Sequence, residues 1–430
     1  MKYHQIDRHL FIKNRSKFTA QMKPKSLAIF NSNDIYPVSA DSTLPFAQHR
    51  DIFYLSGIDQ EESILLLCPD APYEHQKEML FLKETSELIA IWEGAKLTKE
   101  EAFAVSGIKT VHWLQDFEKV LFEMMTYTDT MYINTNEHYR SHVETETREA
   151  RFVKWWKEKY PAHAVAKSNP ILQRLRSVKE NEELDLIQNA CNITEKGFRR
   201  ILSFVKPNVT EYEIEAEFIH EFIRNRSKGF AYTPIIASGN NANVLHYIEN
   251  NQQCKAGDLI LLDVAVEYAN YSSDLTRTIP VSGRYSERQK AVYNAVLRVK
   301  NEATQMLTPG TLWKQYQAEV GKIMSSELLG LGLLDKADVQ NENPEWPAYK
   351  KYFMHGTSHH MGLDTHDYGI LTEPMQANMV FTVEPGIYIP EEGFGIRLED
   401  NVVIQETGEP FNLMKNIPIE VEEIESLMNS

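Results

Sequence analysis

The amino-acid sequence predicts an α+β protein with two domains, a smaller α/β domain over residues 1–172 and a larger α+β domain over residues 173–430. Three observations lead to this prediction. The chain has 430 residues, whereas a typical domain has about 150, so more than one domain is expected. In its first part, short apolar runs alternate with helical segments. In its second part, a pair of predicted helices precedes an apolar hairpin, and this order occurs twice.

The first domain is indicated by apolar runs at 26–30, 63–67 and 131–134, which are typical of buried strands. Segments of helical character separate them. A polar break at 167–170 contains Asn169 and Pro170 and is followed by a charged stretch. We therefore place the domain boundary near residue 172.

The first half of the second domain begins with apolar residues at helical spacing between Leu184 and Ile201. Thr210 and Glu213 have the spacing of a capping box, in which a hydroxyl and a carboxylate each satisfy a free backbone N–H at a helix start. They predict a second helix. An apolar hairpin is then expected at 258–281.

The second half repeats this order. Ser286 and Gln289 form another predicted capping box, residues 308–311 end that helix, and a further helix begins near Leu312. A second apolar hairpin is expected at 379–404. Two related halves of this kind pack sheets against helices, with an active site expected between them.

Composition excludes several classes of partner. The chain carries 45 Lys and Arg against 61 Asp and Glu, a net charge of −16, which disfavours nucleic acid and anionic membranes. No apolar run approaches the roughly 20 residues of a membrane span. Cys68, Cys191 and Cys254 are too few and too widely spaced for a disulfide framework. They are expected to be buried, in a chain of a reducing compartment such as the cytoplasm.

Acidic residues occur inside both apolar hairpins. Asp263 interrupts an otherwise apolar strand at 259–266, and a lone buried carboxylate is costly. Asp274 follows after a turn that we centre between residues 268 and 269, which would place it directly opposite Asp263. In the second hairpin, a turn centred between 391 and 392 would place Glu384 opposite Glu399, with Arg397 on the same face.

A histidine-rich segment lies between the hairpins, with four of the 14 histidines of the chain at positions 355, 359, 360 and 366. Four carboxylates and an imidazole suit relatively hard divalent ions, Mn²⁺ first and Zn²⁺, Co²⁺ or Fe²⁺ next. Two such ions would offset the four negative charges and support metal-assisted hydrolysis. Each residue taken alone also fits a structural role, and the conjunction of all of them favours the metal site.

At these positions the sequence resembles the pita-bread metallopeptidases, and among them most closely the Xaa-Pro aminopeptidases. The motifs that carry the resemblance lie at 237–247, 262–264, 273–278, 354–367, 382–386 and 395–400. The resemblance implies a pita-bread fold with pseudo-twofold halves for residues 173–430. It also implies a dinuclear centre, with bridging roles for two of the carboxylates. The implied metal ligands are Asp263, Asp274, His359, Glu384 and Glu399, with Asp274 and Glu399 as the bridges.

The same resemblance implies the roles of further residues. Glu384 would act as general base as well as ligand. His246 and His366 would stabilise the tetrahedral intermediate and hold the substrate. His355 and Arg397 would line the side that receives proline and orient Glu399 or the substrate. The implied reaction is release of the N-terminal residue from a peptide whose second residue is proline.

Segments at 46–57 and 91–94 resemble the N-terminal domain of the same family, which methionine aminopeptidases lack. Prolidase, which cleaves Xaa-Pro dipeptides, shares both domains and all five ligands and stays an alternative. A metal-free, creatinase-like hydrolase and an inactive pita-bread binding module are more remote alternatives. The family resemblance also implies a homodimer or homotetramer, peptide substrates, and no nucleic-acid or membrane partner.

Overall fold

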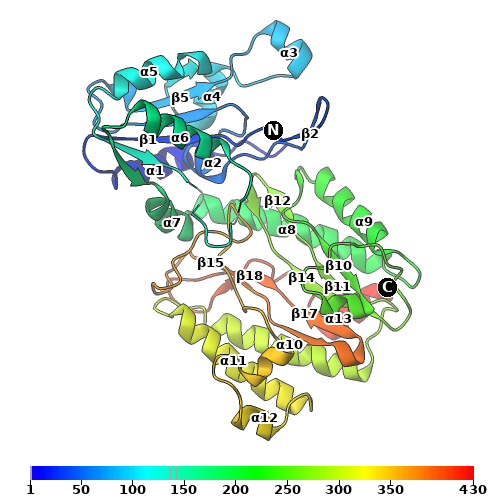
Figure 1. Cartoon of the computed structure of the whole chain (residues 1–430). Helices are drawn as coiled ribbons and strands as arrows, with labels where there is room; N and C mark the ends of the chain where they lie inside the picture. The colour runs from blue at the N-terminus through cyan, green and yellow to red at the C-terminus, as the bar shows by residue number, and fades with distance from the viewer. Residues whose placement is uncertain (1, 136, 142) are drawn as a thin grey trace. The chain divides into compact units, whose positions relative to one another are not determined.

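The first unit of the chain, Tyr3–Leu175, is built on a six-stranded mixed sheet in the order β6-β5-β4-β1-β7-β8 (Figure 1). The computed structural model describes residues 2–135, 137–141 and 143–430. The strands of this sheet are β1 (Ser26–Asn31), β4 (Ile64–Leu67), β5 (Glu78–Leu82), β6 (Thr110–Trp113), β7 (Thr130–Ile133) and β8 (Ala164–Lys167). A short hairpin precedes α2 and consists of β2 (Pro37–Ser39) and β3 (Ser42–Thr43).

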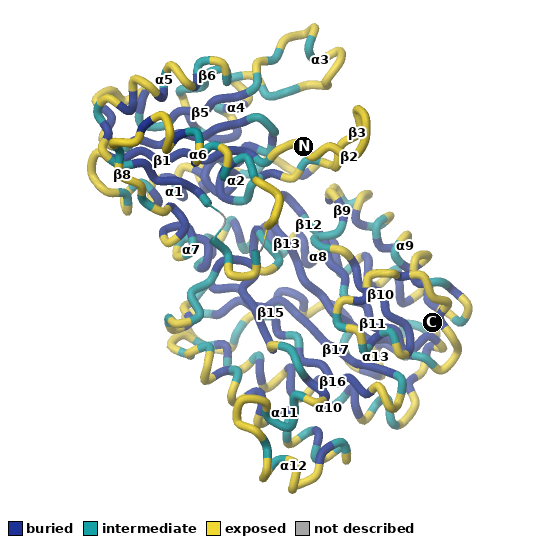
Figure 2. Tube along the Cα trace, in the orientation of Figure 1, coloured by how far each residue is buried: buried dark blue, intermediate teal, exposed yellow. Residues whose placement is uncertain are grey.

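Helices cover this sheet and connect its strands. They are α1 (Arg8–Thr19), α2 (Arg50–Ser56), α3 (Glu87–Glu93), α4 (Lys99–Ser106), α5 (Phe117–Met124), α6 (Arg148–Lys159) and α7 (Asn169–Ser177). All six residues of β1 are buried, as expected for the apolar run at 26–30. The central strands are dark blue in Figure 2, whereas α3 and the β2–β3 hairpin are largely exposed. The predicted α/β character of this part is confirmed.

The second unit, Arg176–Ser430, contains two helix pairs, each followed by a hairpin. The helices are α8 (Asn181–Phe204), α9 (Glu211–Arg224), α10 (Glu287–Gln305), α11 (Trp313–Gly330), α12 (Lys336–Gln340) and α13 (Val421–Met428). Both predicted capping boxes are present, at the starts of α9 and α10. The helix expected near Leu312 is α11, for which Leu312 is the N-cap.

Short strands and 3₁₀ turns make up the rest of this unit. The strands are β9 (Gly229–Phe230), β10 (Ile235–Ser238), β11 (Leu259–Asp263), β12 (Val266–Tyr268), β13 (Tyr271–Ser272), β14 (Thr276–Pro280), β15 (Val380–Val383), β16 (Gly386–Ile389), β17 (Phe394–Arg397), β18 (Asp400–Val403) and β19 (Phe411–Asn412). Helix α8 packs against the first hairpin, α9 packs against β9 and β10, which pair with that hairpin, and α10 packs against the second hairpin. The α+β fold of two helix-pair and hairpin halves is thus as predicted.

The register predicted for the first hairpin is wrong. Asp263 pairs with Thr276, not with Asp274. Ala269 and Asn270 both adopt positive φ, of 53° and 66°, as the two central residues of a tight hairpin turn do. The turn is therefore centred one residue later than expected, and the register moves by two. A shift of two preserves the face of every side chain, so Asp263 and Asp274 remain on one face as diagonal neighbours.

The register predicted for the second hairpin is confirmed on both sides of its acidic pair. Val383 pairs with Asp400, and Gly386 pairs with Arg397. The same register places Glu384 opposite Glu399. The turn is the 3₁₀ segment Pro390–Glu392, closed by Gly393 at φ 73°, a backbone conformation that favours glycine.

The two hairpins are joined next to these acidic residues. Thr276 of the first hairpin forms a β-bridge with Glu399 of the second. The neighbouring Arg277 is fully buried and ion-pairs with Asp400 at 2.6 Å, and it also donates to the carbonyl oxygen of Glu399 at 2.7 Å. Lys300 of α10 contacts the same Asp400 carboxylate. The interior of the second unit is therefore held by charge-assisted bonds between its halves as well as by apolar packing.

Replacing Arg277 with alanine is expected to lower the free energy of unfolding of the second unit by about 3–5 kcal/mol. The substitution leaves the buried Asp400 carboxylate without its arginine partner. Arg298→Ala is the matched control, since Arg298 pairs with Glu327 at the surface and should cost less than about 1 kcal/mol. Urea denaturation of both variants measures the difference. Equal effects would show that the Arg277 pair does not tie the halves together.

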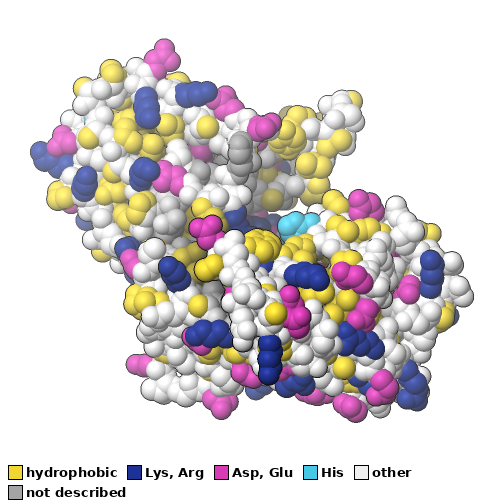
Figure 3. Space-filling view, turned by 60° about the horizontal axis from the view of Figure 1, so that its bottom comes forward, with side chains coloured by type: hydrophobic (Ala, Val, Ile, Leu, Met, Phe, Trp, Pro, Cys, Tyr) yellow, Lys and Arg dark blue, Asp and Glu magenta, His cyan; other side chains and the backbone are white. Residues whose placement is uncertain are grey.

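All three cysteines are free and buried, as expected. Among the described residues, no helix combines the length and the hydropathy required to cross a membrane. On the face shown in Figure 3, Lys and Arg side chains are interspersed with Asp and Glu. This face therefore offers no continuous basic surface of the kind that binds nucleic acid.

Candidate metal centre

The five predicted ligands come from five different positions in the second unit. Asp263 ends β11, and Asp274 lies between β13 and β14. Glu384 lies between β15 and β16, and Glu399 lies between β17 and β18. His359 belongs to the segment between η4 (Ala348–Lys351) and β15, and its backbone N–H donates to the hydroxyl of Thr382 at 3.1 Å. The four carboxylates thus lie next to strand ends, and His359 is held by its bond to Thr382 of β15.

Short contacts link these five residues into one cluster. Asp274, His359 and Glu399 each offer a ligand atom, and the three atoms lie within 4.8 Å of one another. His359 Nε2 lies 3.4 Å from Asp274 Oδ2 and 3.6 Å from Glu384 Oε1. Asp263 joins through Tyr232, whose hydroxyl lies 2.6 Å from both Asp263 Oδ1 and Asp274 Oδ1. The structure therefore brings together all the residues that the motifs singled out as ligands.

Burial and mutual repulsion raise the pKa of most of these carboxyl groups. Burial raises the pKa of Glu384 to about 7, and the charges of Asp274 and Asp263 add to the effect. Burial and the three neighbouring carboxylates hold the pKa of Glu399 well above its ordinary value. The pKa of Asp263 is also raised, by burial first and by Asp274 next, although Arg397 opposes the shift. The cluster therefore holds more negative charge than its one arginine offsets, which favours a bound cation.

His359 has the hydrogen-bonding arrangement of a metal ligand. Its Nδ1 lies 3.0 Å from the carbonyl oxygen of His360 and so carries the proton, since a carbonyl only accepts. Nε2 then faces the carboxylates of Asp274 and Glu384, to which it can donate when the ring is protonated, and it offers a lone pair to a metal ion when the ring is neutral. Although burial lowers its pKa, the hydrogen bond to Asp274 and the charge of Glu384 raise it overall. The residues present thus fit a divalent metal ion bound at Nε2.

The adjacent His360 is in a different environment. Its ring packs on Phe381, with ring centroids 4.2 Å apart. Burial lowers its pKa to about 3, so the ring is neutral, and its Nδ1 has no hydrogen-bond partner among the described residues. His360 therefore packs in the interior while His359 faces the carboxylates.

His355 and Arg397 meet at the hydroxyl of Tyr388. His355 Nδ1 lies 2.8 Å from the carbonyl oxygen of Gly356, so Nε2 accepts from Tyr388 Oη at 2.7 Å. Arg397 Nη1 donates to the same oxygen at 2.8 Å. Burial first and the charge of Arg397 next lower the pKa of His355 to about 3. His355 is therefore a neutral ring beside the acidic cluster.

Arg397 pairs with Asp263 through Nη2, rather than with Glu399. Glu399 instead accepts a hydrogen bond from the hydroxyl of Thr276 at 2.7 Å. Arg397 Nε donates to that same hydroxyl at 3.2 Å. Arg397 and Glu399 are thus linked through the hydroxyl of Thr276.

The two remaining predicted residues lie at the outside of the cluster. His366 packs on His359, with ring centroids 4.2 Å apart, and its side chain is exposed. His246 is exposed on the segment after β10, and its charge contributes to lowering the pKa of His355. Trp92 lies on α3 of the first unit with 84% of its side chain exposed.

Tyr232, Thr276 and Tyr388 are site residues that the sequence analysis missed. Burial first and the carboxylates of Asp263 and Asp274 next raise the pKa of Tyr232 well above its ordinary value, so its hydroxyl stays protonated and donates. Thr276 and Tyr388 stand two residues after Asp274 and four after Glu384, on strands already identified. Strand alternation could have suggested both, whereas nothing in the sequence around Tyr232 indicates that it reaches the site.

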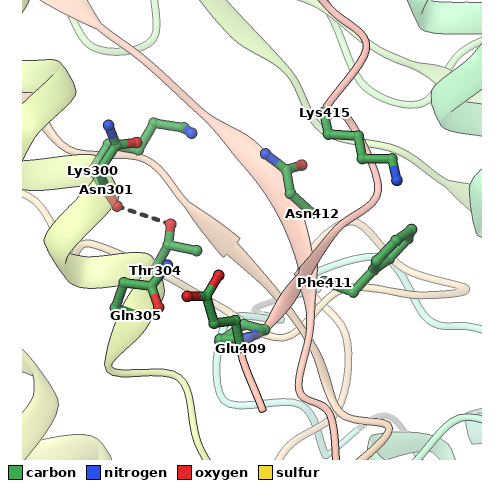
Figure 4. A pocket seen from close by; sticks show the side chains of 9 residues that line it. Lys300, Asn301, Thr304, Gln305, Glu409, Phe411, Asn412 and Lys415 are labelled. Atoms are coloured by element: carbon green, nitrogen blue, oxygen red, sulfur yellow. Dashed lines mark hydrogen bonds between the residues drawn. The ribbon is translucent and has the colours of Figure 1, made fainter.

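A pocket of about 340 Å³ lies between α10 and the strand β19 (Figure 4). It is lined by Lys300, Asn301, Thr304, Gln305, Glu409, Pro410, Phe411, Asn412 and Lys415. Lys300 is held by Asp400, and Thr304 donates to the Lys300 carbonyl oxygen at 2.8 Å. None of the predicted ligands lines this pocket, so it is separate from the candidate metal centre.

Comparison with known proteins identifies the family of the chain. Residues 185–406 match the model of metallopeptidase family M24, and residues 11–132 match that of the aminopeptidase P N-terminal domain. The chain is 33% identical to Xaa-Pro aminopeptidases of Haemophilus influenzae and Escherichia coli, over 99% of this chain and 98% of each relative. It is similar to the structure of a zinc-substituted E. coli aminopeptidase P in complex with product, with 31% identity, a TM-score of 0.87 and 99% coverage of both chains.

Proposed function

Since the chain belongs to metallopeptidase family M24 and is a full-length relative of its Xaa-Pro aminopeptidases, we propose that it releases the N-terminal residue from peptides whose second residue is proline. The observation that carries this proposal is the convergence of the ligand cluster in a chain with both family domains. All five ligand positions hold metal-binding side chains, which disfavours an inactive binding module.

We propose that Asp263, Asp274, His359, Glu384 and Glu399 would hold two divalent ions. Four carboxylates and one imidazole are donors best suited to Mn²⁺. When bound, the metal supplies Lewis acidity and lowers the pKa of water, so that hydrolysis proceeds near neutral pH.

Glu384 is placed to move protons during hydrolysis. Its side chain is 21% exposed, more than the side chains of Asp274 and His359 beside it, so solvent and substrate can reach it. We assign Glu384 the role of general base, which accepts a proton from the attacking water and delivers it to the leaving prolyl nitrogen. The histidines at the outside of the cluster, His246 and His366, donate hydrogen bonds to the substrate carbonyl oxygen as negative charge develops on it.

His355 and Arg397 line the prolyl side in this proposal. Proline contributes a tertiary amide without an N–H, so the surrounding groups need not accept a hydrogen bond from it. The neutral His355 ring and the Tyr388 hydroxyl form a wall of low charge there. Arg397 forms an ion pair with Asp263 and donates a hydrogen bond to the hydroxyl of Tyr388. We therefore propose that its charge orients these two residues.

Peptide length separates this activity from that of prolidase. We expect kcat/KM for a Xaa-Pro-Xaa tripeptide to exceed that for the matching Xaa-Pro dipeptide by about tenfold or more. A dipeptide places its terminal carboxylate on the proline, where the neutral His355 supplies no positive charge and Arg397 is already paired with Asp263. Liquid chromatography of the released residue measures both rates. Activity confined to the dipeptide would identify a prolidase instead.

We further propose that the protein works in the cytoplasm as a homodimer or homotetramer. Its three buried free thiols suit a reducing compartment. The exposed apolar residues Leu88, Ile91 and Trp92 of α3 suit contact with a second copy of the chain. Light scattering on the purified protein measures the oligomeric state.

A further inference from the structure

Glu211, the first residue of α9, has a fully buried carboxylate that none of the site motifs explains. It accepts five hydrogen bonds from neutral donors, all in the segment 238–252. The donors are the backbone N–H of Ser238 (2.8 Å), the hydroxyl of Ser238 (2.7 Å), Nδ2 of Asn241 (3.3 Å), the hydroxyl of Tyr247 (2.7 Å) and the backbone N–H of Gln252 (3.0 Å). One carboxylate thus holds both ends and the middle of this segment.

The segment that Glu211 holds carries His246. On either side of it, Leu245 and Tyr247 pack against a buried apolar cluster that contains Tyr388, while His246 itself is exposed. Tyr388 is the residue whose hydroxyl contacts His355 and Arg397. The segment is therefore a wall of the candidate site, and the bond from Tyr247 to Glu211 sets how the chain next to His246 is oriented.

Asn250 also holds the end of this segment, through bonds with Ile236, Pro234 and Glu215, but the stretch next to His246 has fewer polar anchors. The backbone N–H groups of Val244 and Tyr247 donate only locally, to the carbonyl oxygens of Asn241 and Val244. A carboxylate accepts charge-assisted bonds that are about twice as strong as neutral ones. An amide at the same position would direct an N–H toward donors and leave several of them unsatisfied. The charge of Glu211 therefore contributes to the orientation of the stretch next to His246, together with Asn250 and the apolar packing.

We infer that Glu211 is a positioning residue for His246, holding that imidazole where it can donate a hydrogen bond to the substrate. This inference rests on the proposed function, because it takes from it the role of His246. Glu211 itself does not touch the ligand cluster and acts only through the segment.

A double-mutant cycle tests the inference. Glu211→Gln is expected to lower kcat for a Xaa-Pro-Xaa tripeptide about tenfold, with a smaller change in KM, since a misplaced donor loses contact mainly in the transition state. In a His246→Ala background the same substitution should change kcat less than about twofold, because the group it positions is already absent. An equal loss in both backgrounds, or no loss in the first, overturns the inference.

Glu213→Gln is the matched control. Glu213 lies in the same first helical turn and is exposed, and among the described residues it accepts from Thr210, at 2.7 and 2.8 Å. It should retain kcat within about twofold of the parent. If Glu211→Gln does not fold, Tyr247→Phe takes its place, because it removes one donor to Glu211 and keeps the ring. We expect Tyr247→Phe to lower kcat about threefold in the parent background. The same double-mutant cycle with His246→Ala then tests the inference.

Hydrogen exchange followed by mass spectrometry provides a measurement that does not depend on activity. Amides of residues 239–252 should exchange faster in Glu211→Gln than in the parent and in Glu213→Gln. Unchanged exchange overturns the inference. If the parent protein fails to cleave Xaa-Pro peptides while exchange in this segment still rises, the proposed function has failed and the anchoring role of Glu211 has not.

Discussion

Glu384→Ala is expected to lower kcat for a Xaa-Pro-Xaa tripeptide by about 10³-fold or more. The substitution removes a metal ligand and, in the proposed mechanism, the group that accepts the proton of the attacking water. A chromatographic assay of the released residue, run at saturating metal, measures the loss. A variant that retains the rate of the parent would refute the role of Glu384.

The fold should survive this substitution. Glu384 carries a pKa raised to about 7 by burial and by neighbouring carboxylates, so in the metal-free protein its charge is a cost to the native state. Removing it should leave the unfolding midpoint of the metal-free protein unchanged or slightly higher. Glu391→Ala, at the exposed tip of the same hairpin, is the matched control and should retain full activity.

Metal removal is expected to have an equally large effect. Dialysis against EDTA should reduce turnover below about 1% of the starting rate, and added Mn²⁺ should restore it, because hydrolysis near neutral pH requires the Lewis acid. Magnesium added at the same concentration is the control, since Mg²⁺ is poorly suited to a largely protein-made cage. Full activity after chelation would favour the metal-free, creatinase-like alternative.

The stability of the metal-free protein is also expected to depend on pH. Burial raises the pKa of Glu384 from 4.5 to about 7 and raises the pKa values of Asp263 and Glu399. Between the pKa values of the unfolded and the native state, the native state binds more protons than the unfolded state. The free energy of unfolding therefore falls as pH rises from about 4.5 to about 7. Thermal unfolding of the chelated protein should show a falling midpoint from about pH 5 to pH 8. Added Mn²⁺ should reverse the decline by binding only the native cluster.

Several parts of this protein follow from local sequence alone. Capping boxes at Thr210 and Ser286 mark the starts of α9 and α10, because a capping box is satisfied within one helical turn. In a hairpin whose loop has an even number of residues, odd spacing between two acidic residues places both on one face, even when the turn shifts by one residue along the chain. For this reason Asp263 and Asp274 stay together although their predicted register was wrong.

Other parts are decided only by tertiary structure. Tyr232 joins Asp263 to Asp274 from a segment about 30 residues earlier, and Glu211 holds the chain around His246 from the start of α9. The choice between His359 and His360 depends on which ring packs against Phe381 and which faces the carboxylates. Periodicity and capping act over one turn or one hairpin, whereas these contacts depend on how separate elements pack, and that information is not present in any short stretch of sequence.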